Sequence, residues 1–164
     1  MSTVLVPIDF SEHSLNALDR VMNMRDKLGD EVALAYVKPS NFFKSFLGTE
    51  SEKKQLNEEV QHKLQHLKTQ YNYDFPFYEG EGAIYKNIVQ IAQQVEAELM
   101  IMGTHGHSGF EEFWIGGNAY KTVSAAPCPV ITLRESFQKG GFSNIILPID
   151  QSDHTRQKVP FTAE

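Results

Sequence analysis

Several features that mark secreted, membrane or nucleic-acid-binding proteins are scarce in this sequence. Its one cysteine is Cys128, so no disulfide can form within the 164-residue chain, which indicates a reducing compartment. Apolar runs are short, as at Val32–Val37, whereas a membrane-spanning helix needs about 20 such residues. With 21 acidic and 15 basic residues, the net charge of −6 argues against a nonspecific hold on nucleic acid. The opening MSTVLVPIDF has no basic region, so we expect no signal peptide and a cytoplasmic location.

Short apolar segments alternate with amphipathic segments along residues 1–134, which we expect to form one domain. Strands are predicted at Val4–Ile8, Val32–Val37, Tyr73–Tyr78, Leu99–Met102 and Val130–Leu133. Helices are predicted from the N-cap Ser11 to Gly29 and over residues 49–72, 83–95 and 118–125. In the second helix the apolar positions are Leu56, Val60, Leu64 and Leu67, so one face is expected to be buried.

This alternation predicts an α/β fold with a doubly wound parallel sheet. Strands that are apolar throughout are buried on both faces, and right-handed crossovers cover those faces with helices. Pro76 indicates an edge position for the third strand. Ligands of such sheets bind at the carboxyl ends of the strands, where Asp9, Val37 and the loop after Met102 lie. The alternative role for Asp9 is to cap the turn that follows it.

A glycine-rich loop, MGTHGHSGFEEFWIGG, follows the fourth predicted strand. Gly103 and Gly106 come just after that strand, and Gly116 and Gly117 come just before a helix. Glycines let backbone N–H groups approach a ligand closely, and the N-terminus of a helix favours phosphate. We therefore predict a phosphate-binding loop. The alternative is a connection whose glycines only permit tight turns and packing.

Motifs of the related nucleotide-dependent enzymes are missing. The first strand leads into PIDFSEH, which contains neither the serine- and glycine-rich loop nor the His-x-x-His signature of ligases with related topology. Between Gly103 and Gly117 there is no lysine or arginine to stabilise a transferred phosphate. We find no paired carboxylates and no Ser-His-Asp set elsewhere, so we predict no catalytic residues and no enzyme.

Residues 1–134 resemble the universal stress protein family. The resemblance rests on an opening strand that ends in aspartate, a second strand that ends near valine, the loop pattern G-x2-G-x9-G-[ST] and a closing APCPV strand. It implies a five-stranded, Rossmann-like sheet of order 3-2-1-4-5, as in adenine nucleotide alpha hydrolase-like proteins. It also implies a nonenzymatic stress-response domain that binds ATP or a related adenine nucleotide, with Mg²⁺ as the ion that would accompany ATP. A homodimer through the last strand, residues 128–134, is implied as well.

The resemblance assigns roles to individual residues. Asp9 would accept hydrogen bonds from ribose or adenine, Val37 would contact adenine, and the loop glycines and Asn118 would surround the phosphates. The predicted nucleotide site comprises Pro7, Ile8, Asp9, Val37, Met102, Gly103, His105, Gly106, His107, Gly116, Gly117 and Asn118. No metal ligand from the protein is predicted.

Two positions depart from the family pattern, and both weaken the hold on phosphate. Gly117 stands where a serine or threonine is expected, so a hydroxyl group is missing. His107 stands where relatives often have arginine, which replaces a permanent cation by one that titrates near pH 6.5. Nucleotide affinity is therefore expected to fall as the pH rises through the titration of His107. The competing interpretation is a dimeric interaction module of the same fold whose site no longer binds nucleotide.

The tail repeats the beginning of the chain. IILPIDQSDHT matches VLVPIDFSEHS, with Pro148 and Asp150 in the places of Pro7 and Asp9. We interpret residues 135–143 as a linker and residues 144–164 as the first strand and helix start of a truncated second domain, as in tandem members of the family. The alternative is a C-terminal extension that merely resembles the first strand.

Other candidate sites have simpler explanations. His62 and His66 have the spacing of a metal pair on a helix, but their neighbours are polar and indicate a solvated face. Cys128 is interpreted as a small apolar residue instead of a nucleophile. Two aromatic groups are candidates for a lid or an interface, namely Phe42, Phe43 and Phe46 with Leu47, and Phe110 and Phe113 with Trp114.

Overall fold

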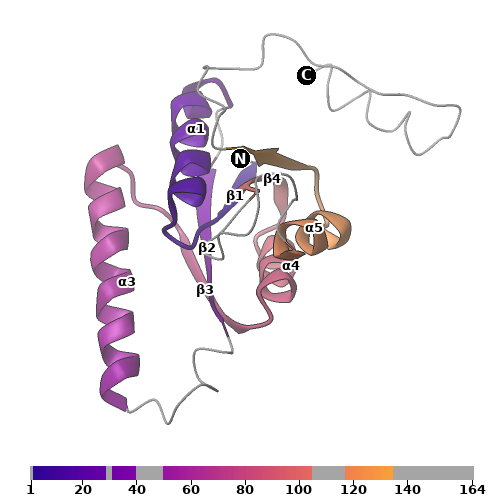
Figure 1. Ribbon diagram of the computed structural model, residues 1–164. Coiled ribbons are helices and arrows are strands. Elements are labelled where there is room, and N and C mark those ends of the chain that lie inside the picture. The colour runs from indigo at the N-terminus through magenta and orange to yellow at the C-terminus, as the bar shows by residue number, and fades with distance from the viewer. Residues whose placement is uncertain (1, 29–30, 40–49, 105–116, 135–164) are drawn as a thin grey trace, which may run out of the picture.

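Strands and helices alternate along the whole described part of the chain (Figure 1). The computed structural model describes residues 2–28, 31–39, 50–104 and 117–134. The strands are β1 (Thr3–Pro7), β2 (Glu31–Pro39), β3 (Phe77–Gly82), β4 (Ala97–Gly103) and β5 (Val130–Leu133). The helices are α1 (Glu12–Leu28), α3 (Glu50–Tyr71), α4 (Ile84–Gln94) and α5 (Gly117–Ala125). The predicted linker 135–143, the repeat 144–164 and both aromatic groups lie outside the described residues.

The five strands form one parallel sheet of order β3-β2-β1-β4-β5, which confirms the predicted fold class and strand order. β1 is central, and its Leu5 is paired with Ala33 of β2 and Met100 of β4. After β1 the chain adds β2 and β3 on one side of it and then β4 and β5 on the other side. The order in which strands are added therefore reverses at β1. In a sheet of this kind, the connections that follow the two adjacent strands at that point run to opposite faces, which leaves room for a ligand.

Side chains of successive strand residues point to opposite faces and so build two apolar layers. Val4, Val6 and Tyr36 belong to the layer that packs under α1 and α3. Leu5 and Ala35 belong to the layer that packs under α4 and α5. Figure 1 shows α1 and α3 on one side of the sheet and α4 and α5 on the other.

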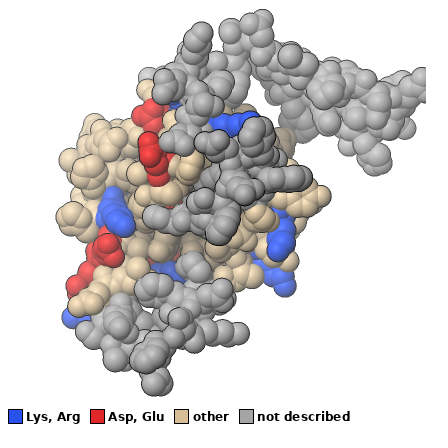
Figure 2. Space-filling model, viewed as in Figure 1, with Lys and Arg blue, Asp and Glu red and all other residues tan. Residues whose placement is uncertain are grey.

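Helix α3 is amphipathic, as its apolar spacing predicts. Val60, Leu64 and Leu67 are buried, and Leu56 packs against the same layer. His62 and His66 are exposed, and the described ranges contain no group of three or more side chains that could hold a metal ion. No described helix has both the length and the apolar character to cross a membrane. On the face shown in Figure 2, the described acidic and basic side chains are interspersed, without a continuous basic surface.

The third strand begins later than predicted. Tyr73 and Phe75, expected in the strand, instead form a T-shaped pair beneath the sheet, with ring centroids 4.8 Å apart. The Tyr73 hydroxyl accepts a hydrogen bond from the N–H of Val32 at 3.1 Å. β3 starts at Phe77, just after Pro76, and lies at the edge of the sheet as expected. The alternating aromatic residues therefore reflect a packed connection, whereas the polar, glycine-containing segment after it forms the strand.

Candidate functional site

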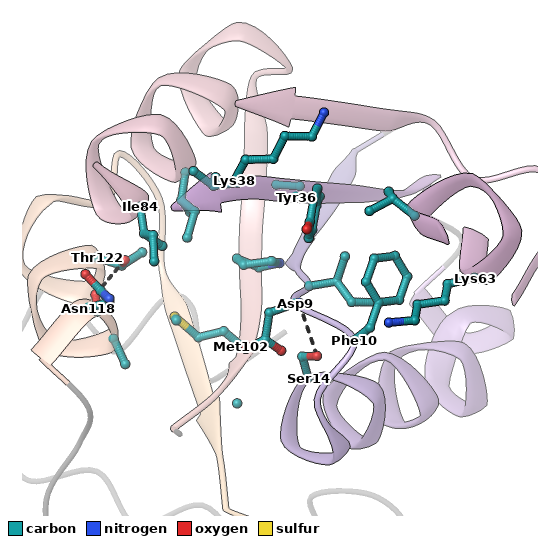
Figure 3. A pocket seen from close by; sticks show the side chains of 18 of the residues that line it. Asp9, Phe10, Ser14, Tyr36, Lys38, Lys63, Ile84, Met102, Asn118 and Thr122 are labelled. Atoms are coloured by element: carbon teal, nitrogen blue, oxygen red, sulfur yellow. Dashed lines mark hydrogen bonds between the residues drawn. The ribbon is translucent and has the colours of Figure 1, made fainter. Parts of the chain in front are cut away.

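The carboxyl ends of β1, β2 and β4 surround a cavity of about 560 Å³ (Figure 3). Strand residues and the turn after β1 supply Pro7, Ile8, Asp9, Phe10, Ala35, Tyr36, Val37, Lys38, Met102, Gly103 and Thr104 to its wall. Helices supply Ser14, Leu56, Glu59, Val60, Lys63, Ile84, Ile88, Gly117, Asn118, Ala119 and Thr122. The cavity thus lies where a doubly wound sheet is expected to bind its ligand.

Eight of the twelve positions predicted for the nucleotide site line this one cavity, namely Pro7, Ile8, Asp9, Val37, Met102, Gly103, Gly117 and Asn118. They come from four separate parts of the chain, so their convergence is a property of the fold. His105, Gly106, His107 and Gly116 lie outside the described residues.

Asp9 stabilises the turn between β1 and α1, which is the alternative role considered for it. Its Oδ1 accepts hydrogen bonds from the N–H of Ser11, at 2.9 Å, and from the Ser11 hydroxyl. Ser11 is also the N-cap, as predicted, because the N–H of Ser14 donates to its Oγ at 3.4 Å. A carboxylate has about four acceptor positions. Capping the turn is therefore compatible with a contact between the same carboxylate and a ligand.

Phe10 is a wall residue that sequence reasoning missed. Its φ of 59° lies in the left-handed region, which is uncommon for a residue with a side chain. Its ring contacts Tyr36, with centroids 5.5 Å apart, and the Lys63 Nζ lies 5.6 Å from its centroid. With this backbone conformation, the Phe10 ring forms an aromatic wall together with Tyr36 on the α3 side of the cavity (Figure 3). Nothing in the sequence at this position predicts a positive φ.

Two lysines also line the cavity, Lys38 and Lys63, and neither is among the predicted site residues. The Lys38 Nζ donates to Asn57 Oδ1 at 2.7 Å and lies 3.3 Å from a Glu79 oxygen. Lys63 lies 3.7 Å from a Glu59 oxygen. Lys38 directly follows Val37 at the end of a predicted strand, so the sequence could have predicted its place in the cavity wall. The position of Lys63 depends on how α3 packs across the sheet, which its sequence does not specify.

The hydroxyl of Tyr36 lies in a negative environment. Burial raises the pKa of the Tyr36 phenol above its ordinary value. The carboxylates of Glu79, Asp9 and Glu59 raise it further, because they disfavour a phenolate nearby. Tyr36 therefore stays protonated and can donate or accept a hydrogen bond at neutral pH.

At the other end of the cavity, α5 begins with Gly117 and Asn118. The first N–H groups of a helix have no partner within the helix, so they can donate to an anion. Thr122 is buried, and its hydroxyl donates to the Asn118 carbonyl oxygen at 2.8 Å. This bond lies within α5 and occupies a carbonyl oxygen of its first turn.

Comparison with known proteins identifies the fold and the family. Residues 1–134 match the model of the universal stress protein family. The chain belongs to this family.

Among its relatives, universal stress protein MJ0531 of Methanocaldococcus jannaschii is 28% identical over 141 residues, which is 80% of this chain and 81% of that one. Similarity to solved structures concerns the fold. The structure of MJ0577 from the same organism has a TM-score of 0.74 at 24% identity, over 83% of this chain and 97% of that one. A universal stress protein solved in complex with cAMP has a TM-score of 0.60 at 19% identity, over 81% and 96% of the two chains.

The two described glycines of the family loop have different surroundings. A Cβ atom at Gly103 would lie 2.9 Å from the carbonyl oxygen of His13, so glycine here permits β4 to approach α1. At Gly117 a Cβ atom would meet nothing within 4 Å. The space for the family's serine or threonine is therefore present, although this chain has no hydroxyl there.

Proposed function

We propose that this universal stress protein is a nonenzymatic stress-response domain that binds an adenine nucleotide, with ATP as the expected ligand. The observation that carries the proposal is one cavity at the carboxyl ends of the strands, which is lined by eight of the positions that the family resemblance assigns to the nucleotide site. The universal stress protein solved with cAMP supports an adenine nucleotide as the class of ligand, since it has the same fold.

The walls suggest an orientation for the nucleotide. The adenosine would lie between Asp9 and Val37, where a carboxylate, backbone groups and apolar side chains are available. The phosphates would lie at Gly117 and Asn118, against the unpaired N–H groups that begin α5. Backbone donors and the helix dipole would supply most of this attraction, because neither of the two lysines that line the cavity, Lys38 and Lys63, belongs to α5.

The proposal assigns binding and no phosphoryl transfer. Lys38 is engaged by Asn57 and Glu79, so it is not placed as a cation for a transferred phosphate. Any hydrolysis of bound ATP would be slow and incidental. Mg²⁺ would arrive with ATP and be held mainly by phosphate oxygens and water, as is usual for this ion.

A test follows from the two roles of Asp9. In Asp9→Asn, Oδ1 can still accept the N–H of Ser11, but an NH2 group replaces the second oxygen and cannot accept a hydrogen bond from ribose or adenine. We expect ATP affinity to fall about ten-fold, as for the loss of a hydrogen bond to a charged group, with a small change in stability. Glu12→Gln is the control, because it removes the same charge from an exposed position on α1. Equal affinity in wild type and Asp9→Asn would contradict the assigned role.

We also propose that the protein is a homodimer joined through its last strand. β5 lies at an edge of the sheet and, among the described strands, pairs only with β4. Such an edge offers unpaired backbone groups to a second strand. The exposed Tyr120 and Val123 on α5 add apolar surface to the element that precedes β5. If no nucleotide binds, this edge favours the interaction module as the alternative function.

A further inference from the structure

The cavity continues beyond the predicted nucleotide site to the opposite face of the sheet. Ala35 and Val37 belong to the layer under α4 and α5, whereas Tyr36 between them belongs to the layer under α1 and α3. All three line the same cavity, so it bends around the carboxyl edge of β2. We call its α3 part the side pocket, formed by Phe10, Tyr36, Leu56, Glu59, Val60 and Lys63. None of these six residues is in the predicted nucleotide site.

The side pocket is mainly apolar and aromatic. The rings of Phe10 and Tyr36 meet at an angle of 50°, and Tyr36 stacks in turn on Phe77. Val60 is buried and Leu56 half-buried, both on the same face of α3. In Figure 3 Phe10 and Lys63 lie on one side of Asp9, and Asn118 and Thr122 lie on the other. The side pocket is therefore at the end opposite the first turn of α5.

The charges of the side pocket disfavour another phosphate group. Within the side pocket the Glu59 carboxylate is paired with the Lys63 ammonium at 3.7 Å, and the Asp9 carboxylate of the neighbouring nucleotide site leaves a net negative charge at this end of the cavity. Burial raises the pKa of the Tyr36 phenol, and the carboxylates of Glu79, Asp9 and Glu59 raise it further. An anion would lose solvent and be repelled, whereas an uncharged ring would gain contacts with Phe10 and Leu56.

We propose that the side pocket binds an uncharged aromatic group attached to the adenosine end of a nucleotide. The nucleotide site and the side pocket adjoin at two consecutive residues. Asp9 is assigned to ribose or adenine, and the next residue, Phe10, lines the side pocket. A ring carried on the base or on the ribose could thus enter without displacing the phosphates from α5. The inference rests on the proposed function and specifies its ligand class.

The experiment compares three probes on the full chain by calorimetry. They are ATP, ATP with a benzyl group on the adenine 6-amino nitrogen, and ATP with an N-methylanthraniloyl group on the ribose. At least one analogue should bind about ten-fold tighter than ATP, through burial of apolar ring surface. Leu56→Glu places a charge in the side pocket, and Leu56→Trp fills it with an apolar ring. Each should remove the advantage of the analogue and change ATP affinity less than two-fold, about 0.4 kcal/mol.

Gln61→Glu is the matched control, since it adds the same charge to an exposed position of α3 and should alter neither affinity. Thermal unfolding of every variant establishes that it is folded. If ATP binds but neither analogue binds tighter, or if both Leu56 variants reduce ATP and analogue alike, the side-pocket assignment is wrong. If wild type binds none of the three probes, the proposed function fails and the inference fails with it.

Discussion

Gly103 at the end of β4 lies against the first turn of α1, where a Cβ atom would be only 2.9 Å from the carbonyl oxygen of His13. That contact is with backbone, which cannot move aside as a flexible side chain can. We expect Gly103→Ala to lower the free energy of unfolding by about 1–3 kcal/mol, the usual cost of overpacking. Gly117→Ala is the control and should be nearly neutral, because its Cβ meets nothing within 4 Å. Urea unfolding of the two variants measures the difference, and equal stabilities would disprove the contact.

Gly117 offers a gain-of-function test of the phosphate end. Gly117→Ser supplies the hydroxyl that the family pattern has at this position, and the structure has room for it. A hydrogen bond to a charged phosphate contributes about 1.5–3 kcal/mol, so we expect ATP affinity to rise at least ten-fold. Gly117→Ala provides the same Cβ without the hydroxyl and should leave the affinity unchanged. An equal effect of both substitutions would place the phosphates elsewhere.

Tyr71 predicts how stability depends on alkaline pH. Burial raises the pKa of its phenol to about 12, and the Asp19 carboxylate, which accepts its hydrogen bond at 3.3 Å, adds to the shift. The folded state keeps the proton where an unfolded tyrosine, with a pKa near 10, has lost it. The stabilisation is therefore complete below pH 10 and is lost as pH rises from about 10 to about 12. Unfolding experiments over this range should show a smaller decline in Tyr71→Phe than in wild type, and equal declines would contradict the prediction.

The edge position of β5 predicts the assembly. Sedimentation velocity at micromolar concentration should show a homodimer. Ile131→Lys in β5 should shift the equilibrium toward monomer, because it places a charge beside the proposed strand pairing. Gln61→Lys makes the same addition of charge on the exposed face of α3 and should leave the dimer intact. A monomeric wild type, or a dimer unaffected by Ile131→Lys in a folded variant, would show that β5 is not the interface.

The sheet could be predicted from the sequence because its central strands are continuous apolar runs with helical periodicity between them. β3 could not be bounded in this way. It is an edge strand of sequence FYEGEG, whose polar and glycine residues do not indicate a strand. Its extended conformation is stabilised by pairing with β2. The aromatic residues Tyr73 and Phe75 gave a stronger strand pattern, but they pack beneath the sheet before the strand begins.

The residues that line the cavity could be predicted where they are local to strand ends, but not where they come from distant elements. Asp9 and Val37 end apolar runs, so topology alone brings them to one edge. Glu59 and Lys63 reach the cavity only because α3 crosses the sheet beside Tyr36. Periodicity shows which face of α3 is buried, but a single sequence does not show which strand end that face covers.

The most direct test of the account is calorimetric titration of the purified chain with Mg²⁺-ATP at millimolar concentration, after any bound ligand has been removed by denaturation and refolding. We expect saturable binding of one nucleotide per chain, abolished or weakened in Asp9→Asn and strengthened in Gly117→Ser. Adenine absorbance in the material released on denaturation would identify a ligand carried through purification. Neither heat of binding nor a thermal shift with ATP, in a chain that is folded and has released no nucleotide, would contradict the proposed function.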